Sequence, residues 1–153
     1  MSESSAAASG RTLVEDGPFA GWWTWGRGSD PFETLIGPFH YRLDEAGKPI
    51  TAMQARPEHC NGGGFLHGGL LMSFVDFSLF AIAHYALQDT YAVTLTCSTE
   101  FLGAGQVGQR VMGSGEVTRE TGSMIFLQGR LTQADAPIIA FSGILKKIRP
   151  KPN

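Results

Sequence analysis

The sequence has little of what marks a secreted, membrane-bound or nucleic-acid-binding protein. Its 153 residues include two cysteines, Cys60 and Cys97, which are too few for a disulfide framework and favour reduced thiols in a cytoplasmic protein. The formal net charge of -2 argues against nucleic acid as a partner, because such binders need a basic surface. Residues 1–10 are rich in Ser and Ala and lack the basic start and apolar centre of a secretory signal.

Several catalytic signatures are also missing. Neither GxxxxGK[ST] nor GxSxG is present, which removes the main support for P-loop ATPases and serine hydrolases. Gly103–Gly108 matches GxGxxG, but the residues after it are too rich in glycine for the helix that this motif requires, so we predict a glycine-containing hairpin turn. His59, Cys60 and His67 are too few for a closed zinc site, and we expect no metal. His59 beside Cys60 is weak support for a cysteine nucleophile, because adjacency in sequence says little about geometry.

The length fits one domain with a sizeable core. We expect a disordered tail over 1–10, a single domain over 11–148 with a Trp-rich N-terminal extension, and a basic tail over 149–153. Asp30–Gly37 predicts a short helix with Asp as N-cap, Pro at the first position and Gly at the end. A long helix is predicted from Gly68 to near Gln88. The predicted strands are 39–43 and 50–56, which form a hairpin, followed by 93–101, 107–118, 124–132 and 138–148. This order favours an α+β fold in which an antiparallel meander lies across the helix.

The most informative stretch runs from His59 to Ala83. Five glycines within eight residues lead into an apolar helix, in which Asp76 is the one carboxylate and Lys and Arg are absent up to Gln88. A lone buried acid is costly and needs a reason to be present. The helix is too short and too interrupted to span a bilayer. Because it is apolar nearly all round and one sheet covers one side, we expect a second subunit to cover the other.

The start of this helix predicts an anion or oxyanion site. Backbone N–H groups at a helix N-terminus favour negative charge, and Gly68 and Gly69 would leave their amides open. Asp76 follows two helical turns later, about 10–12 Å along the axis, on the same face as Gly69, Ser73 and Phe80. A two-fold dimer could bring Asp76 of one subunit to the helix start of the other. A polar helix contact for Asp76 and close loop packing for the glycines are alternatives that the residues alone leave open.

These residues resemble the hotdog-fold thioesterases, specifically the phenylacetate-pathway (PaaI-type) branch that includes 4-hydroxybenzoyl-CoA thioesterases. The family motif is N-x-x-G-x-x-H-G-G followed on the helix by Asp. The resemblance spans roughly residues 32–147 and includes the order of one helix followed by strands. The matching positions are Asn61, Gly64, His67, Gly68, Gly69 and Asp76.

The resemblance implies a hotdog fold, with a five- or six-stranded antiparallel sheet wrapped around the central helix, and a homodimer or dimer of dimers (a homotetramer). It implies hydrolysis of an acyl-CoA thioester without metal or redox cofactor, coenzyme A being part of the substrate. The Gly68 N–H would polarise the carbonyl, and Asn61 would position carbonyl or water. Asp76 of the neighbouring subunit would be base or nucleophile, with Thr94 close to it and His67 structural or orienting.

The substrate is expected to contact further residues, namely Gly64, Gly69, Ser73 and Phe80. Aromatic residues such as Phe74, Phe77 and Trp22 favour an aromatic or medium-chain acyl group. Two other functions remain open, a hotdog hydratase or dehydratase acting on hydroxyacyl thioesters and a non-catalytic acyl-CoA binding module. Basic residues that could contact the CoA phosphates are Arg110, Arg119, Arg130, Lys146, Lys147, Arg149 and Lys151.

Overall fold

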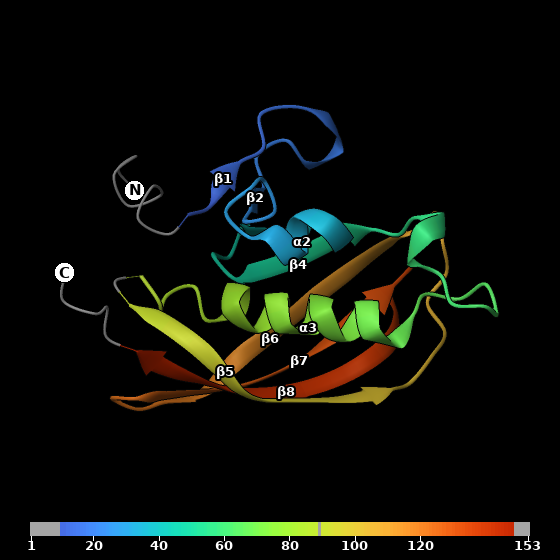
Figure 1. Ribbon diagram of the computed structural model, residues 1–153. Helices are drawn as coiled ribbons and strands as arrows, with labels where there is room; N and C mark the ends of the chain where they lie inside the picture. The colour runs from blue at the N-terminus through green and yellow to red at the C-terminus, as the bar shows by residue number, and fades with distance from the viewer. Residues whose placement is uncertain (1–9, 89, 149–153) are drawn as a thin grey trace.

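A computed structural model describes residues 10–88 and 90–148. Over these residues the chain forms one antiparallel sheet of eight strands with the long helix α3 (Gly68–Ile82) lying across one face (Figure 1). The strand order is β1-β2-β3-β4-β6-β7-β8-β5. Two short 3-10 turns, Gly17–Phe19 and Pro57–His59, and a short helix, α2 (Pro31–Ile36), complete the elements. The strands are β1 (Thr12–Leu13), β2 (Trp23–Thr24), β3 (His40–Leu43), β4 (Pro49–Gln54), β5 (Tyr91–Phe101), β6 (Arg110–Glu120), β7 (Met124–Gln133) and β8 (Ala136–Ile148).

The core lies between α3 and the sheet. Phe74, Val75 and Leu79 of the helix are fully buried against it. Glycines on the strands let the helix approach closely, because a Cβ at Gly143 would lie 2.5 Å from Leu79 Cδ1. Larger side chains there would push the helix away, so close packing depends on small residues in the sheet.

The N-terminal segment covers the opposite, outer face of the sheet. Val14, Phe19 and Trp22 form a second small core there with Ala52 of β4. His40 of β3 stacks on Phe19 with ring centroids 3.9 Å apart. The three tryptophans therefore lie in two places. Trp22 is on this outer face, whereas Trp25 stacks on Tyr41 and Trp23 lies tilted against it. The Tyr41 ring lies 6.3 Å from that of Phe77 of α3. The Trp-rich extension is thus an integral part of the packing.

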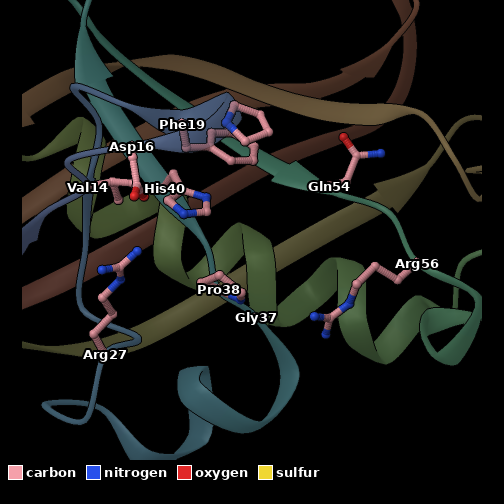
Figure 2. A pocket seen from close by; sticks show the side chains of 10 residues that line it. Val14, Asp16, Phe19, Arg27, Gly37, Pro38, His40, Gln54 and Arg56 are labelled. Atoms are coloured by element: carbon pink, nitrogen blue, oxygen red, sulfur yellow. The ribbon is translucent and has the colours of Figure 1, made fainter.

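A pocket of about 190 Å³ opens between this segment and the ends of β3 and β4 (Figure 2). Asp16 and His40 line it, with Arg27 and Arg56 at opposite sides in this view. Burial, followed by the charge of Arg27, lowers the pKa of His40 to about 4. His40 is therefore neutral near pH 7.

The structure confirms the α+β class, the antiparallel sheet around one long helix, and the hairpin of β3 and β4. It also confirms α2, whose N-cap is Asp30, with the Glu33 N–H donating to Asp30 Oδ1 at 3.0 Å, and which ends at Gly37. Within the described residues, no helix is long and apolar enough to cross a membrane. Most of the two predicted tails, residues 1–9 and 149–153, lies outside the described residues.

Three expectations about the sheet are wrong. The four strands after the helix do not form a continuous meander, because β5 pairs with β8 at the far edge while β6 pairs with β4. The Gly103–Gly108 segment is consequently part of the connection that leads from β5 across to β6, and not a hairpin turn. The sheet has eight strands rather than five or six over the described residues, because β1 and β2 of the N-terminal segment extend it. Alternation of side chains locates strands but does not state which strands pair.

Candidate active site

The loop before α3 is organised by Asn61. Its side-chain Oδ1 accepts hydrogen bonds from the N–H groups of Gly63, at 2.9 Å, and Phe65, at 3.2 Å. Gly64 has a φ of +81°, a left-handed conformation that favours glycine, and its N–H donates to the Asn61 carbonyl. Asn61 therefore shapes the loop with its oxygen, which leaves the Nδ2 group as the part that could contact a substrate.

His67 caps the start of α3. Its Nδ1 accepts a hydrogen bond from the Gly69 N–H at 2.9 Å, so that nitrogen carries no proton and the neutral ring holds its proton on Nε2. This contact corrects one expectation, because the amide of Gly69 is not open. The N–H of Gly68, at the first helical position, has no acceptor among the residues that the structure describes. Of the two glycine amides that were expected to be open, that of Gly68 remains available as a donor.

Asp76 lies in the middle of α3 and is held by Thr94 of β5. The Thr94 Oγ1 donates a hydrogen bond to Asp76 Oδ1 at 2.6 Å. The pairing of β5 with β8 is irregular between Thr94 and Thr96, which is the kind of bulge that redirects a side chain. The structure therefore brings together two residues that the sequence places on separate elements, as the family resemblance implied for them.

A pocket of about 300 Å³ surrounds Asp76. Its lining is mainly apolar, with Asp30, Glu33 and Asp76 as the acidic members, and the remaining residues are Phe32, Phe39, Met72, Ser73, Phe77 and Cys97. Burial, together with the charge of Asp76, raises the pKa of the Cys97 thiol, so this cysteine is protonated and a poor nucleophile. The pocket places the carboxyl group of Asp76 among apolar side chains, an arrangement that suits activation of water next to an apolar acyl group.

Sequence reasoning missed Glu33. Burial, then the charges of Asp30 and Asp76, raises the pKa of this side chain to about 8. The order Asp30-x-x-Glu33 is that of a capping box, in which the glutamate turns back to its own helix end in solvent. In the structure Glu33 lines the Asp76 pocket instead. No local sequence signal distinguishes these two orientations, because the pocket is formed by distant elements.

The other predicted substrate contacts are placed as follows. Ser73 lines the Asp76 pocket, and its hydroxyl donates to the Gly69 carbonyl at 2.9 Å. Phe80 packs against the main core and is not among the residues that line this pocket. His59 donates from Nε2 to the Ile36 carbonyl and accepts at Nδ1 from the Arg56 N–H. Both of its ring nitrogens are engaged, so His59 is not available as a base for Cys60.

Two of the basic candidates for CoA phosphates have local partners. The Arg110 guanidinium lies 4.4 Å from the centre of the Phe19 ring and donates to the Pro18 carbonyl, and Lys147 pairs with Glu120. Arg149 and Lys151 lie outside the described residues.

The two reactive features are far apart in one chain. Eight residues of helix separate Gly68 from Asp76, which is about 12 Å along the axis. The face between them is the open side of α3, where Gly69 and Met72 are exposed and Ser73 and Asp76 are half-buried. A single thioester carbonyl could not contact both ends of this segment in the same subunit.

Comparisons with known proteins identify the family of this chain. Residues 63–140 match the family model of the thioesterase superfamily. The Pseudomonas aeruginosa protein named "Putative esterase PA0474" is 31% identical over 117 residues, which are 76% of this chain and 87% of that protein.

Two solved structures show the same fold. A mutant of the phenylacetic acid degradation protein PaaI from Thermus thermophilus has a TM-score of 0.67 at 20% identity, covering 78% of this chain and 100% of that one. The smu.793 protein of Streptococcus mutans UA159, bound to acetyl CoA, has a TM-score of 0.65 at 18% identity, covering 74% and 91%. The chain belongs to the thioesterase superfamily, and it is a thioester hydrolase.

Proposed function

We propose that the protein is an acyl-CoA thioesterase that acts on an aromatic or medium-chain acyl group, in the cytoplasm, where its two thiols stay reduced. The observation that carries the proposal is Asp76, a carboxylate held by Thr94 beside a pocket of about 300 Å³. Membership of the thioesterase superfamily supports the reaction, and the acetyl CoA bound to the Streptococcus mutans neighbour supports the carrier. Phe32, Phe39 and Phe77 of the pocket support the choice of acyl group.

In the proposed mechanism, the Gly68 N–H of one subunit donates a hydrogen bond to the thioester carbonyl oxygen. This donor stabilises the negative charge that grows on the oxygen as the carbonyl carbon is attacked. The Nδ2 group of Asn61 lies on the same loop and helps to position the carbonyl or the attacking water. His67 caps the helix start by accepting a hydrogen bond from the Gly69 N–H.

Asp76 comes from the other subunit and can act in one of two ways, as a general base or as a nucleophile. As a base it takes a proton from water, whose oxygen attacks the carbonyl carbon; the C–S bond then breaks and the departing thiolate takes up the proton. As a nucleophile it attacks that carbon itself, and the C–S bond breaks as CoA leaves as a thiolate that takes a proton from solvent. Water then hydrolyses the resulting anhydride. Both routes release a free acid and the CoA thiol with water as co-reactant, and neither needs a metal or redox cofactor.

The smallest complete unit in this proposal is a homodimer. β5 lies at the edge of the sheet and is eleven residues long. Its side chains include Tyr91, Leu95 and Phe101, which are 54%, 50% and 52% exposed. A long, apolar edge strand is a template for pairing with another chain. A second copy at this edge would cover the open side of α3, and a dimer of dimers is the larger assembly that the resemblance implies.

The test measures free thiol released from a panel of aryl-CoA and straight-chain acyl-CoA substrates. We expect Asp76→Asn to lose about a hundredfold or more in kcat/KM, the scale for a positioned acid–base group. Asp135→Asn is the matched control, because Asp135 lies in an exposed turn at a φ of +64° that Asn tolerates. Equal rates for wild type and Asp76→Asn would remove the assigned role of Asp76.

The same experiment separates the competing functions. Release from no substrate, with CoA binding retained in calorimetry, would support a binding module. Formation or loss of a hydroxyacyl-CoA double bond, followed by absorbance, would support a hydratase or dehydratase. A monomeric mass in light scattering at micromolar concentration would contradict the shared site.

A further inference from the structure

Glu33 is a polar group without a structural purpose in the contacts that surround it. It lies on α2, whose N-cap is supplied by Asp30, and it is half-buried. Its Oε2 atom is buried and makes no hydrogen bond to the residues that the structure describes. A buried oxygen without a partner costs free energy relative to a solvated one, so a glutamate here needs an explanation.

The pocket that Glu33 lines is acidic and otherwise apolar. Asp30, Glu33 and Asp76 are its ionisable carboxyl groups, and no Lys, Arg or His is among its lining residues. One oxygen of Asp30 accepts from the Glu33 N–H, and one oxygen of Asp76 accepts from Thr94. Glu33 is thus the carboxyl group of this pocket whose side chain has no assigned hydrogen-bond partner among the described residues.

The protonation of Glu33 determines what it can offer. Its pKa is raised to about 8, first by burial and then by Asp30 and Asp76, so it holds a proton at neutral pH. A protonated carboxyl group is a hydrogen-bond donor, whereas a carboxylate is an acceptor only. At pH 7 the pocket therefore holds an O–H donor among aromatic side chains, in the same pocket as Asp76.

We propose that Glu33 selects the acyl group of the substrate. Its carboxyl group donates a hydrogen bond to an uncharged oxygen within the acyl chain, such as a ketone or ether oxygen, and the acidic pocket rejects acyl chains that end in a carboxylate. This inference rests on the proposed acyl-CoA hydrolysis and names the substrate class of that site. A site with a buried donor discriminates strongly against a substrate that leaves the donor unpaired, whereas an apolar pocket distinguishes similar chains weakly.

The experiment compares three acyl-CoA substrates of equal chain length: a saturated chain, a chain with one ketone or ether oxygen, and a chain that ends in a carboxylate. For wild type at pH 7 we expect kcat/KM to be about tenfold higher for the oxygen-containing chain than for the saturated chain, and lowest for the carboxylate. Glu33→Met should abolish the preference for oxygen and raise the rate on the saturated chain. Glu33→Gln, which keeps a neutral donor, should retain the preference.

The pH dependence provides an independent readout. The titratable groups that line the pocket with Glu33 are Asp30 from the end of its own helix, Asp76 from α3 and Cys97 from β5. The charges of Asp30 and Asp76 act on Glu33 directly. As the pH rises through about 8, Glu33 loses its proton and its donor, so the preference of wild type for the oxygen-containing chain should fall. The preference of Glu33→Gln should stay constant from about pH 6 to about pH 9, on either side of that pKa, and the exposed control Glu45→Gln should behave as wild type.

The outcomes separate this inference from the proposed function. Thiol release by wild type with the same substrate preference in Glu33→Met would overturn the role of Glu33 while leaving the thioesterase proposal intact. Release from no substrate by wild type would overturn both. If Glu33→Met does not fold, as judged by circular dichroism, the pH profiles of wild type and Glu33→Gln decide the question. A pH-independent preference in wild type contradicts the proposal.

Discussion

The two ends of the catalytic stretch are built in different ways. At the start of α3 the site is made of backbone, and the residues that shape it, Asn61 and His67, bond to amides two to four residues away. Around Asp76 the site is made of side chains, and its partners come from β5 and α2. The first half-site needs its own loop, whereas the second needs most of the fold. Local sequence is therefore a good guide to the first and a poor guide to the second.

The difference also assigns separate tasks to the two halves. A fixed backbone donor is suited to stabilising charge, because it needs no reorganisation during the reaction. A half-buried carboxylate beside a substrate pocket is suited to taking a proton from water or to attacking a carbonyl carbon. The proposed enzyme places these tasks about 12 Å apart on each chain and unites them between chains.

The largest expected effect comes from removing the open amide of Gly68 at the helix start. Gly68→Pro deletes the N–H, and proline is well tolerated at the first position of a helix. His67 already has a ψ of 134°, in the extended region that a residue before proline requires. We expect kcat to fall about a hundredfold to a thousandfold, as for loss of one oxyanion donor. Gly68→Ala is the control, because it adds a similar contact with Phe101 and retains the N–H.

Mixed dimers test whether the halves come from different subunits. A dimer of one Gly68→Pro chain and one Asp76→Asn chain has two active sites if each site is shared between the chains. One of them is intact, because it combines Gly68 of the Asp76→Asn chain with Asp76 of the Gly68→Pro chain. Co-refolding the two inactive proteins in equal amounts should restore about a quarter of the wild-type activity, given two-fold symmetry and random pairing. Sites built within one chain would recover none, and that result would contradict the subunit-sharing mechanism.

A smaller effect is expected from the support of Asp76. Thr94→Val removes the hydroxyl that donates to Asp76 Oδ1 and conserves the shape of the side chain. A hydrogen bond to a charged group is worth about 1.5–3 kcal/mol, so we expect kcat/KM to fall about tenfold or more. Thr94→Ser keeps the donor and should stay close to wild type. Steady-state kinetics on the best substrate of the panel would show the difference. Equal rates for Thr94→Val and Thr94→Ser would mean that Thr94 does not orient the carboxylate.

The features that the sequence predicted correctly are those set by neighbouring residues, and the features that it missed depend on residues far away in the chain. The helix at Pro31–Ile36 was predicted correctly, because Asp30 and Gly37 carry the signals for its two ends. The start of α3 was predicted at Gly68, where it begins, but the predicted end near Gln88 is wrong, because the helix ends at Ile82 and turns follow it. β1 and β2, which have two residues each, are too short to show alternation and were not predicted.

The parts that could not be predicted depend on pairing and orientation. The edge position of β5 follows from its pairing with β8, which no pattern within either strand reveals. Glu33 carries a local capping pattern, yet its side chain lines a pocket formed with distant elements. The amide of Gly69 was expected to be open, but the Nδ1 of His67 takes it, and residue type alone does not specify which nitrogen of the ring faces the helix. The proximity of Thr94 to Asp76 came from the family resemblance.

The smallest expected effect separates the structural from the catalytic task of His67. His67→Ala removes the cap of α3 and should lower the free energy of unfolding by about 1 kcal/mol, measured by urea denaturation. His67→Asn should keep most of that stability, because Asn is a strong N-cap residue. Activity need not follow stability, since loss of Nδ1 frees the Gly69 N–H beside that of Gly68. If His67 only orients the helix start, both variants should stay within about threefold of wild type in kcat, well below the effect of losing a donor to the reacting oxygen. A stable His67→Asn protein that loses about tenfold or more would instead show that the Nε2–H contacts the substrate, and the helix start would then carry a side-chain donor beside its backbone one.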